Sequence, residues 1–276
     1  MTLCIAASCQ EKEPRLILAC DLQSESETAS AEIQDKLYWA HDDWPVLVAG
    51  EMSRAVQLKD IYWNYLRRYF LISKSPLIRQ RTIELMKKPV GIYKRSRANE
   101  CVGRSLGINY QHFLKHGRAI LGDETFKRYV SQIDRIDLDC QLLICSFVEN
   151  RPFIFRVSDQ AENSCEYCEH FAAIGSGMDI AECMLAYREH EADTHLGRAI
   201  YHVYEAWKIG AVAPGVGKKH CLISVFYPPK KGKTITSKRV SEKGMKFLER
   251  RFRELGPKDF FQFPLPENFL EDEYTN

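Results

Sequence analysis

Three residues near the start of the chain have the types needed for nucleophilic hydrolysis. Thr2 follows Met1 and is small enough for a methionine aminopeptidase to remove that Met. The freed α-amine has an unperturbed pKa of about 7.7–8.0, so one residue would supply both a hydroxyl nucleophile and its general base. Asp21 ends the next apolar run, and Lys36 opens the third. We expect Lys36 to favour the neutral amine and stabilise a developing alkoxide, and Asp21 to hold Lys36 charged and oriented.

Short antiparallel strands are the elements that would position these residues. Apolar runs at 2–8 and 15–20 are separated by a polar turn, and a second pair of runs lies at 36–40 and 46–49. Apolar residues then recur at helical spacing over 52–72. A further helix is expected to open at Ser75 and Pro76 and to end at Pro89 and Gly91.

The rest of the chain alternates between the same two kinds of element. The pattern predicts short helices at 108–121 and 124–133, strands at 141–148, 152–157 and 171–174, helices at 179–188 and 194–209, a strand at 221–227 and a helix at 240–255. Antiparallel strand pairs with helices grouped between them predict an α+β fold, with two sheets sandwiched between helix layers. We expect one domain over 1–227 with a helical insertion around 93–139, and a C-terminal extension over 228–276.

Several short motifs follow one another in a recognisable order. They are Thr2, Leu18-Ala19-Cys20-Asp21, Asp35-Lys36-Leu37, Val46-Leu47-Val48-Ala49-Gly50 and Ala172-Ala173-Ile174-Gly175-Ser176-Gly177. Together they resemble a proteasome β-type subunit of the N-terminal nucleophile hydrolases, including bacterial proteasome-like homologues. The likeness spans Thr2 to about Tyr227, with fourteen residues from Lys36 to Gly50 as in the family. It implies a four-layer αββα sandwich assembled into stacked rings.

The resemblance also implies roles for further residues. The Gly50 N–H would form the oxyanion hole, and Ser176 would lie near the Thr2 amine. Val48 and Met52, on either side of Gly50, would form the floor and wall of a specificity pocket. Because both are apolar, apolar substrate residues are expected just before the cut bond. The implied activity is that of a threonine endopeptidase, or at least an amidohydrolase, acting on peptides or unfolded proteins.

One departure from the family pattern supports a different class of function. The family has an Asp before a Ser-Gly-Gly turn near the last strand, whereas the stretch at 210–217 has neither a carboxylate nor a hydroxyl. The alternative is therefore a catalytically inactive structural or regulatory subunit of the same fold. The individual signals also have ordinary explanations: Asp21 and Lys36 could form a strand-end ion pair, Gly50 could start a helix, and Ser176 could cap one.

Two other motifs are too incomplete to predict a cofactor. Cys165-x-x-Cys168-x-His170 is half of a zinc site, without a second Cys/His pair at the usual spacing. Gly215-Val216-Gly217-Lys218 lacks the spacing of a phosphate-binding loop. We therefore expect no metal, nucleotide or other cofactor.

The composition of the chain limits the kinds of partner and the compartment that the sequence predicts. The 276 residues include 39 basic and 37 acidic side chains, so the net charge of +2 gives no case for nucleic acid or a membrane surface. No apolar run approaches the roughly 20 residues of a membrane span, and the start lacks the features of a secretory signal. Ten cysteines, several of them in apolar runs, predict a reduced, cytoplasmic protein. The aromatic residues in 52–72 are more numerous than one core-facing stripe needs, so we expect a homo-oligomer. The sequence leaves open whether a separate ATPase feeds it.

Overall fold

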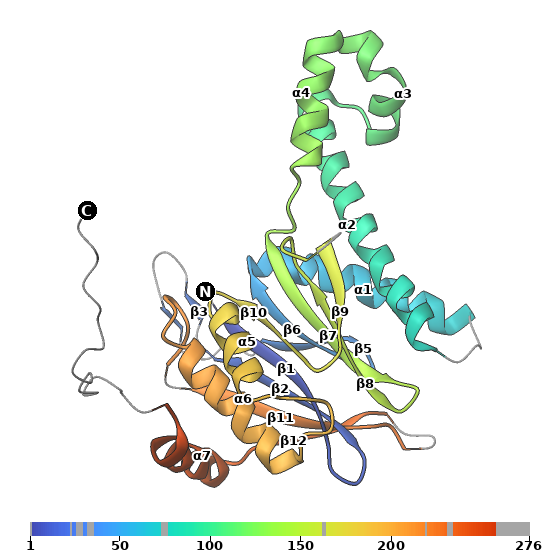
Figure 1. Ribbon diagram of the computed structural model, residues 1–276. Helices are drawn as coiled ribbons and strands as arrows, with labels where there is room; N and C mark the ends of the chain where they lie inside the picture. The colour runs from blue at the N-terminus through green and yellow to red at the C-terminus, as the bar shows by residue number, and fades with distance from the viewer. Residues whose placement is uncertain are drawn as a thin grey trace, which may run out of the picture. The chain divides into compact units, whose positions relative to one another are not determined.

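The computed structural model describes residues 2–257, apart from 23, 26–29, 32–35, 73–76, 162–163, 219 and 231–233 (Figure 1). The chain divides into two compact units, Met1–Ser241 and Glu242–Asn276. The boundary falls after β12 (Thr236–Arg239), which pairs with β11 (Cys221–Tyr227) and so belongs to the first unit. Helix α7 (Glu242–Leu255) belongs to the second unit. The remainder of the predicted C-terminal extension, with the aromatic residues at 260–263, lies outside the described residues.

Two five-stranded antiparallel sheets form the centre of the first unit. The first has the order β10 (Phe171–Gly175), β1 (Leu3–Gln10), β2 (Pro14–Asp21), β11 and β12. The second has the order β5 (Leu37–His41), β6 (Trp44–Gly50), β7 (Cys140–Val148), β8 (Arg151–Val157) and β9 (Cys165–Cys168). A short hairpin pairs β3 (Ser24–Glu25) with β4 (Ser30–Ala31). The chain thus combines helices with antiparallel strands, in agreement with the predicted α+β class.

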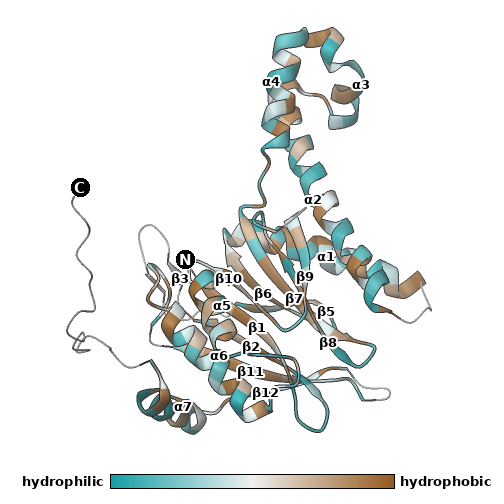
Figure 2. Ribbon diagram, viewed as in Figure 1, coloured by the Kyte–Doolittle hydropathy of each residue, from teal (hydrophilic) through white to brown (hydrophobic). Residues whose placement is uncertain are grey.

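Alternation along β6 shows how the sheets pack. Leu47 and Ala49 belong to a buried cluster shared with the strands of the first sheet. Val46 and Val48 belong to a different cluster, shared with the helices on the opposite face. Because successive strand side chains point to opposite faces, β6 contributes to two cores at once, and its continuous apolar run reflects burial on both sides. Figure 2 shows the same hydrophobic character in β1, β2, β6 and β7.

Helices cover the outer face of each sheet (Figure 1). On the second sheet lie α1 (Met52–Ile72) and the first half of α2 (Arg79–Leu106), and on the first sheet lie α5 (Met178–Tyr187) and α6 (Leu196–Gly210). Beyond the sheet, the C-terminal half of α2 packs against α3 (Tyr110–Leu121) and α4 (Asp123–Asp134), which also pack on each other. None of the described helices combines the length and apolar character needed to cross a membrane.

The prediction that a helix ends at Pro89 and Gly91 was wrong, because α2 runs on to Leu106. Pro89 is buried inside the helix, and the apolar stripe continues beyond it through Val90, Tyr93 and other buried residues. The interior proline costs the helix about 3 kcal/mol, and burial of this stripe offsets that cost. Ser75 and Pro76 lie outside the described residues. Strands β9 and β12 were not predicted either, because neither Cys165–Cys168 nor Thr236–Arg239 contains an apolar run.

The aromatic residues of α1 are more covered than expected. Tyr62 is fully buried and donates a hydrogen bond to the Met86 carbonyl of α2 at 2.7 Å. Tyr65, Tyr69 and Phe70 pack against the same core cluster. Helix α1 therefore needs two apolar faces within its own chain, one for the sheet and one for α2, so its aromatic content is no argument for a partner.

A buried histidine pair joins α6 to the end of β1. The His190 ring lies 2.9 Å through Nε2 from the Ser8 carbonyl and 3.3 Å through Nδ1 from Nδ1 of His202. Nε2 of His202 accepts a hydrogen bond from Arg198 Nε at 3.2 Å. These partners require a proton on His190 Nε2 and another on His202 Nδ1, which leaves both rings neutral.

Stability is therefore expected to fall in mild acid. Burial lowers the pKa of both rings, that of His202 to about 4. Between pH 6.5 and pH 4 the unfolded chain binds protons that the folded chain does not, so unfolding becomes easier as pH falls. From pH 7 to pH 5 the free energy of unfolding in urea should fall by about 1–2 kcal/mol less in His202→Gln than in the unaltered protein. The exposed His116, changed to Gln, is the control, and an equal effect in both variants would contradict the assignment.

Candidate active site

The Asp21 carboxylate joins the hydroxyl and the ammonium predicted for catalysis. Thr2 Oγ1 donates a hydrogen bond to Asp21 Oδ1 at 2.8 Å, and Lys36 Nζ lies 2.9 Å from Asp21 Oδ2. Exposed fractions are 5% for Thr2, 0% for Asp21 and 3% for Lys36. The three predicted residues thus form one buried chain of interactions, although 34 positions separate the first from the last.

Strand ends bring these residues together. Strands β1 and β2 pair with Cys4 opposite Cys20, so Thr2, which immediately precedes β1, lies beside Asp21 at the end of β2. Lys36 comes from the second sheet: it immediately precedes β5, and its carbonyl accepts a hydrogen bond from Val48 N at 3.1 Å. The site therefore lies where the ends of the two sheets meet.

Asp21 also accepts two backbone hydrogen bonds. Leu3 N donates to Oδ1 at 2.8 Å, and Gly217 N donates to Oδ2 at 3.1 Å. A buried carboxylate is tolerable only when it is paired and its oxygens accept hydrogen bonds, and Asp21 has four donors. The stretch at 210–217, which lacks the side chains of the family pattern, thus contributes a backbone amide. Its sequence alone gave no sign of this contact.

A pocket of about 410 Å³ opens beside Thr2. Its lining residues come from both sheets and from the turns that follow them: Thr2, Gly50, Asp139, Cys140, Gln141, Ser158, Asp159, Gln160, Gly175 and Ser176. Three predicted site residues, Thr2, Gly50 and Ser176, therefore meet in one pocket. Asp21 and Lys36 are buried and do not line it.

Two glycines at the pocket are required by backbone geometry. Gly175 has φ +93°, and a Cβ there would lie 2.0 Å from the Thr2 carbonyl oxygen. Gly50 has φ +88°, and a Cβ there would lie 2.8 Å from the Asp139 carbonyl oxygen. A side chain at either position would be strained and would push apart the strands that form the pocket. Ser176 follows Gly175 and contacts Thr2 through its backbone, since Ser176 N donates to Thr2 O at 2.9 Å.

The two residues predicted for the specificity pocket do not line this pocket. Val48 is fully buried between β6 and α1, because it shares a strand face with Val46. Met52, in the first turn of α1, packs against the same cluster and lies 3.9 Å through Sδ from the Tyr38 hydroxyl, which donates to it. The expectation of an apolar substrate preference rested on these two residues, so their position removes its basis.

Several polar residues of the pocket were not predicted. Gln141 Oε1 accepts a hydrogen bond from Gly175 N at 2.6 Å, and Gln141 Nε2 donates to Ser158 Oγ at 3.4 Å. Gln141 therefore links the second sheet to the strand end that holds Ser176. Asp159 follows β8 and lies beside Ser158. The sequence signal that could have found these residues is a polar residue directly before or after an apolar strand, which is also what marks Asp21 and Lys36.

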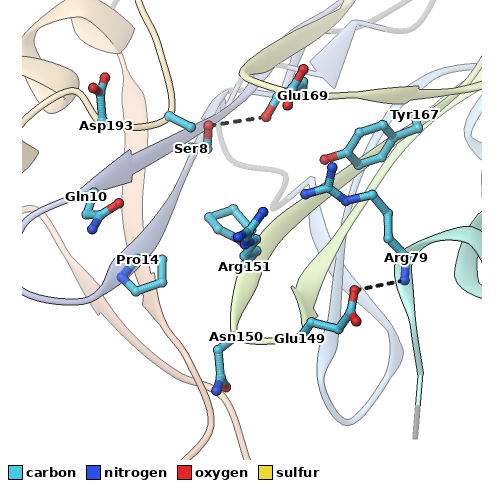
Figure 3. Close-up of a pocket in the computed structure, with 12 residues that line it drawn as sticks. Ser8, Gln10, Pro14, Arg79, Glu149, Asn150, Arg151, Tyr167, Glu169 and Asp193 are labelled. Atoms are coloured by element: carbon cyan, nitrogen blue, oxygen red, sulfur yellow. Dashed lines mark hydrogen bonds between the residues drawn. The ribbon is translucent and has the colours of Figure 1, made fainter.

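A second pocket of about 520 Å³ lies at the other end of β1 (Figure 3). Ser8 lines it, but the Ser8 hydroxyl donates to the His170 carbonyl at 2.8 Å. The nearby His190 ring bonds to the Ser8 carbonyl rather than to the hydroxyl. Among the described residues, Ser8 Oγ is therefore hydrogen-bonded to backbone carbonyls and to no side chain that could act as a general base. Arg79 stacks over Tyr167 at 5.3 Å on the opposite wall.

The cysteine motifs show no metal-binding or nucleophilic geometry. Cys165 and Cys168 stand three positions apart on β9 and belong to different core clusters, which places their thiols on opposite faces of the sheet. The described residues contain no group of three or more His, Cys, Asp or Glu placed to hold a metal ion. The ten cysteines are thiols and form no disulfide with one another. Burial raises the pKa of Cys4, the thiol nearest in sequence to Thr2, which makes it a poor nucleophile.

No protein-family model matches the chain, and no curated protein matches it either. Its function is therefore argued from the geometry of the site.

Proposed function

We propose that the chain is a proteasome-type threonine peptidase in which Thr2, freed by removal of Met1, is the nucleophile. The observation that carries the proposal is the Asp21 carboxylate, which contacts both the Thr2 hydroxyl and the Lys36 ammonium beside a pocket. An ordinary strand-end ion pair would lie at the surface, where the two charges stay hydrated and there is no desolvation penalty. Here the pair is buried, and a buried ion pair is a poor way to gain stability.

The proposed reaction uses groups already at the pocket. Thr2 Oγ attacks a peptide carbonyl carbon, and its proton passes to the free α-amine, directly or through water. The Lys36 charge favours the neutral amine and stabilises negative charge as it develops on Oγ. The Gly50 N–H donates to the carbonyl oxygen as it becomes an oxyanion. The peptide C–N bond then breaks, the leaving amine takes the proton, and water hydrolyses the resulting ester to release Thr2.

The arrangement of elements supports the finer fold assignment. Two antiparallel sheets with α1 and α2 on one outer face and α5 and α6 on the other are what a four-layer αββα sandwich of the N-terminal nucleophile hydrolase type requires. Assembly into a homo-oligomeric ring, unfolded-protein substrates and an ATPase partner are extensions of the same resemblance. Among the described residues, exposed apolar side chains such as Leu71 and Ile72 at the end of α1 and Tyr187 at the end of α5 favour a contact with another molecule.

One observation favours an inactive structural or regulatory subunit as the second candidate. Thr2 is only 5% exposed, and its hydroxyl is engaged by Asp21, so a substrate carbonyl has limited access to it. The inactive subunit would keep the same fold and the same buried network without turnover.

Intact-mass spectrometry separates the two candidates. The purified protein is expected to have lost Met1 and to gain one equivalent of a threonine-directed electrophile, such as an epoxyketone, which requires both the hydroxyl and a free α-amine. Thr2→Ala should gain none. A protein that has lost Met1 and still takes up no electrophile would establish the inactive candidate instead.

A further inference from the structure

The side chains that line the candidate active site are polar and acidic. Beyond Thr2 and Ser176, they include Gln141, Ser158 and Gln160, and the two carboxylates of Asp139 and Asp159. None of the lining residues is Lys, Arg or His. Since Lys36 is buried against Asp21, its charge is already matched. A substrate entering this pocket therefore meets two carboxylates and no cationic side chain in the lining.

Asp159 is one of the two carboxylates that line the pocket. It is exposed at the pocket wall, and Asp159 Oδ2 accepts a hydrogen bond from Leu138 N at 2.8 Å. It forms no ion pair with any Lys or Arg in the described part of the chain. Partial loss of hydration raises the pKa of Asp159, although the Leu138 hydrogen bond opposes this effect. A carboxylate in this position gains from a cationic ligand.

The neighbouring charges do not satisfy Asp159. The charge of Lys94 lowers the pKa of Asp159 from a distance, but Lys94 Nζ donates to Ser164 Oγ at 2.7 Å and forms no ion pair with the Asp159 carboxylate among the described residues. Asp139 has its own partner, since Arg97 Nη2 lies 3.9 Å from its carboxylate. Asp137 adds a further negative charge nearby. Asp159 is therefore the lining carboxylate with room for a cation from outside the chain.

We propose that this pocket selects substrates carrying a positively charged side chain next to the reacting carbonyl, with Asp159 as the specificity-determining residue. The inference rests on the proposed peptidase function and gives it a substrate class: peptides with Arg or Lys before the cut bond. A volume of about 410 Å³ lies in the usual range for a ligand-binding cleft. A charge-assisted hydrogen bond at a partly desolvated wall discriminates strongly between a cation and an apolar side chain.

Three tripeptide aminomethylcoumarins that differ only in a last residue of Arg, Leu or Glu provide the test. The wild-type protein should cleave the Arg peptide with the highest kcat/KM. Asp159→Asn, which keeps an oxygen for Leu138 N and removes the charge, should lower kcat/KM for the Arg peptide about ten- to a hundredfold and leave the Leu peptide within about twofold. Asp137→Asn is the matched control, since it removes an equal charge close by but does not line the pocket.

Binding gives a readout that is independent of turnover. On the Thr2→Ala background, calorimetry with acetyl-Leu-Leu-argininamide should detect binding, and adding Asp159→Asn should weaken it by a similar factor. If no peptide is cleaved while this binding difference is present, the peptidase proposal fails and the site assignment holds. Preference for the Leu or Glu peptide, or an equal loss for all three in Asp159→Asn, would overturn the inference and leave the peptidase proposal intact.

Discussion

Replacing Thr2 with Ala is expected to reduce peptide hydrolysis by about 10⁴-fold or more, as loss of the nucleophile does in other hydrolases. Alanine is small enough that Met1 would still be removed, so the variant keeps its free α-amine and loses only the attacking oxygen. The measurement is kcat/KM on the best peptide from the three-peptide set. Turnover near the wild-type rate would exclude Thr2 as the nucleophile.

Stability serves as the internal control for this variant. Thr2→Ala removes one of the four hydrogen bonds to Asp21 and leaves Leu3 N, Lys36 Nζ and Gly217 N in place. The free energy of unfolding in urea should therefore fall by only about 1–2 kcal/mol. Thr2→Ser keeps both the hydroxyl and the small size needed for Met1 removal, so it should retain most of the stability and measurable activity.

Replacing Lys36 with Met is expected to abolish activity and to destabilise the protein by about 3–5 kcal/mol, because it leaves the Asp21 carboxylate buried without its cation. Methionine has a similar length, so most of the packing is kept. Urea unfolding at neutral pH and peptide hydrolysis measure the two effects separately. A variant that lost activity without losing stability would show that the Asp21–Lys36 pair is not the buried unit described above.

A double variant distinguishes charge from shape. Adding Asp21→Asn to Lys36→Met removes the uncompensated charge and keeps an oxygen that can accept from Thr2 or Leu3. Much of the lost stability should return, since neutral replacements of a buried ion pair are often well tolerated. Activity should not return, because the positive charge near Thr2 is still absent. Recovery of hydrolysis in the double variant would argue against an electrostatic role for Lys36.

Much of the fold could be predicted from the sequence because the relevant signals are local. Helix α1 runs from Met52 to Ile72, as its apolar spacing indicated, and β11 spans 221–227 as predicted. Alternation and helical periodicity report which face of an element is buried, and the neighbours on that face need not be known. The hydroxyl, carboxylate and ammonium of Thr2, Asp21 and Lys36 were also recognisable, since each stands where an apolar run begins or ends.

The sequence by itself thus determined the elements and the chemical types of the candidate catalytic residues, and the tertiary structure decided what surrounds them. Val48 turns toward α1 rather than the pocket because the pairing of β6 sets its face. Asp159 lines the same pocket as Thr2, although more than 150 positions separate them, because β8 and β1 belong to sheets that pack together. Gly217 completes the Asp21 network through an N–H that every residue except proline carries. Long-range packing and backbone donors leave no pattern in the order of residues, so only the folded chain shows them.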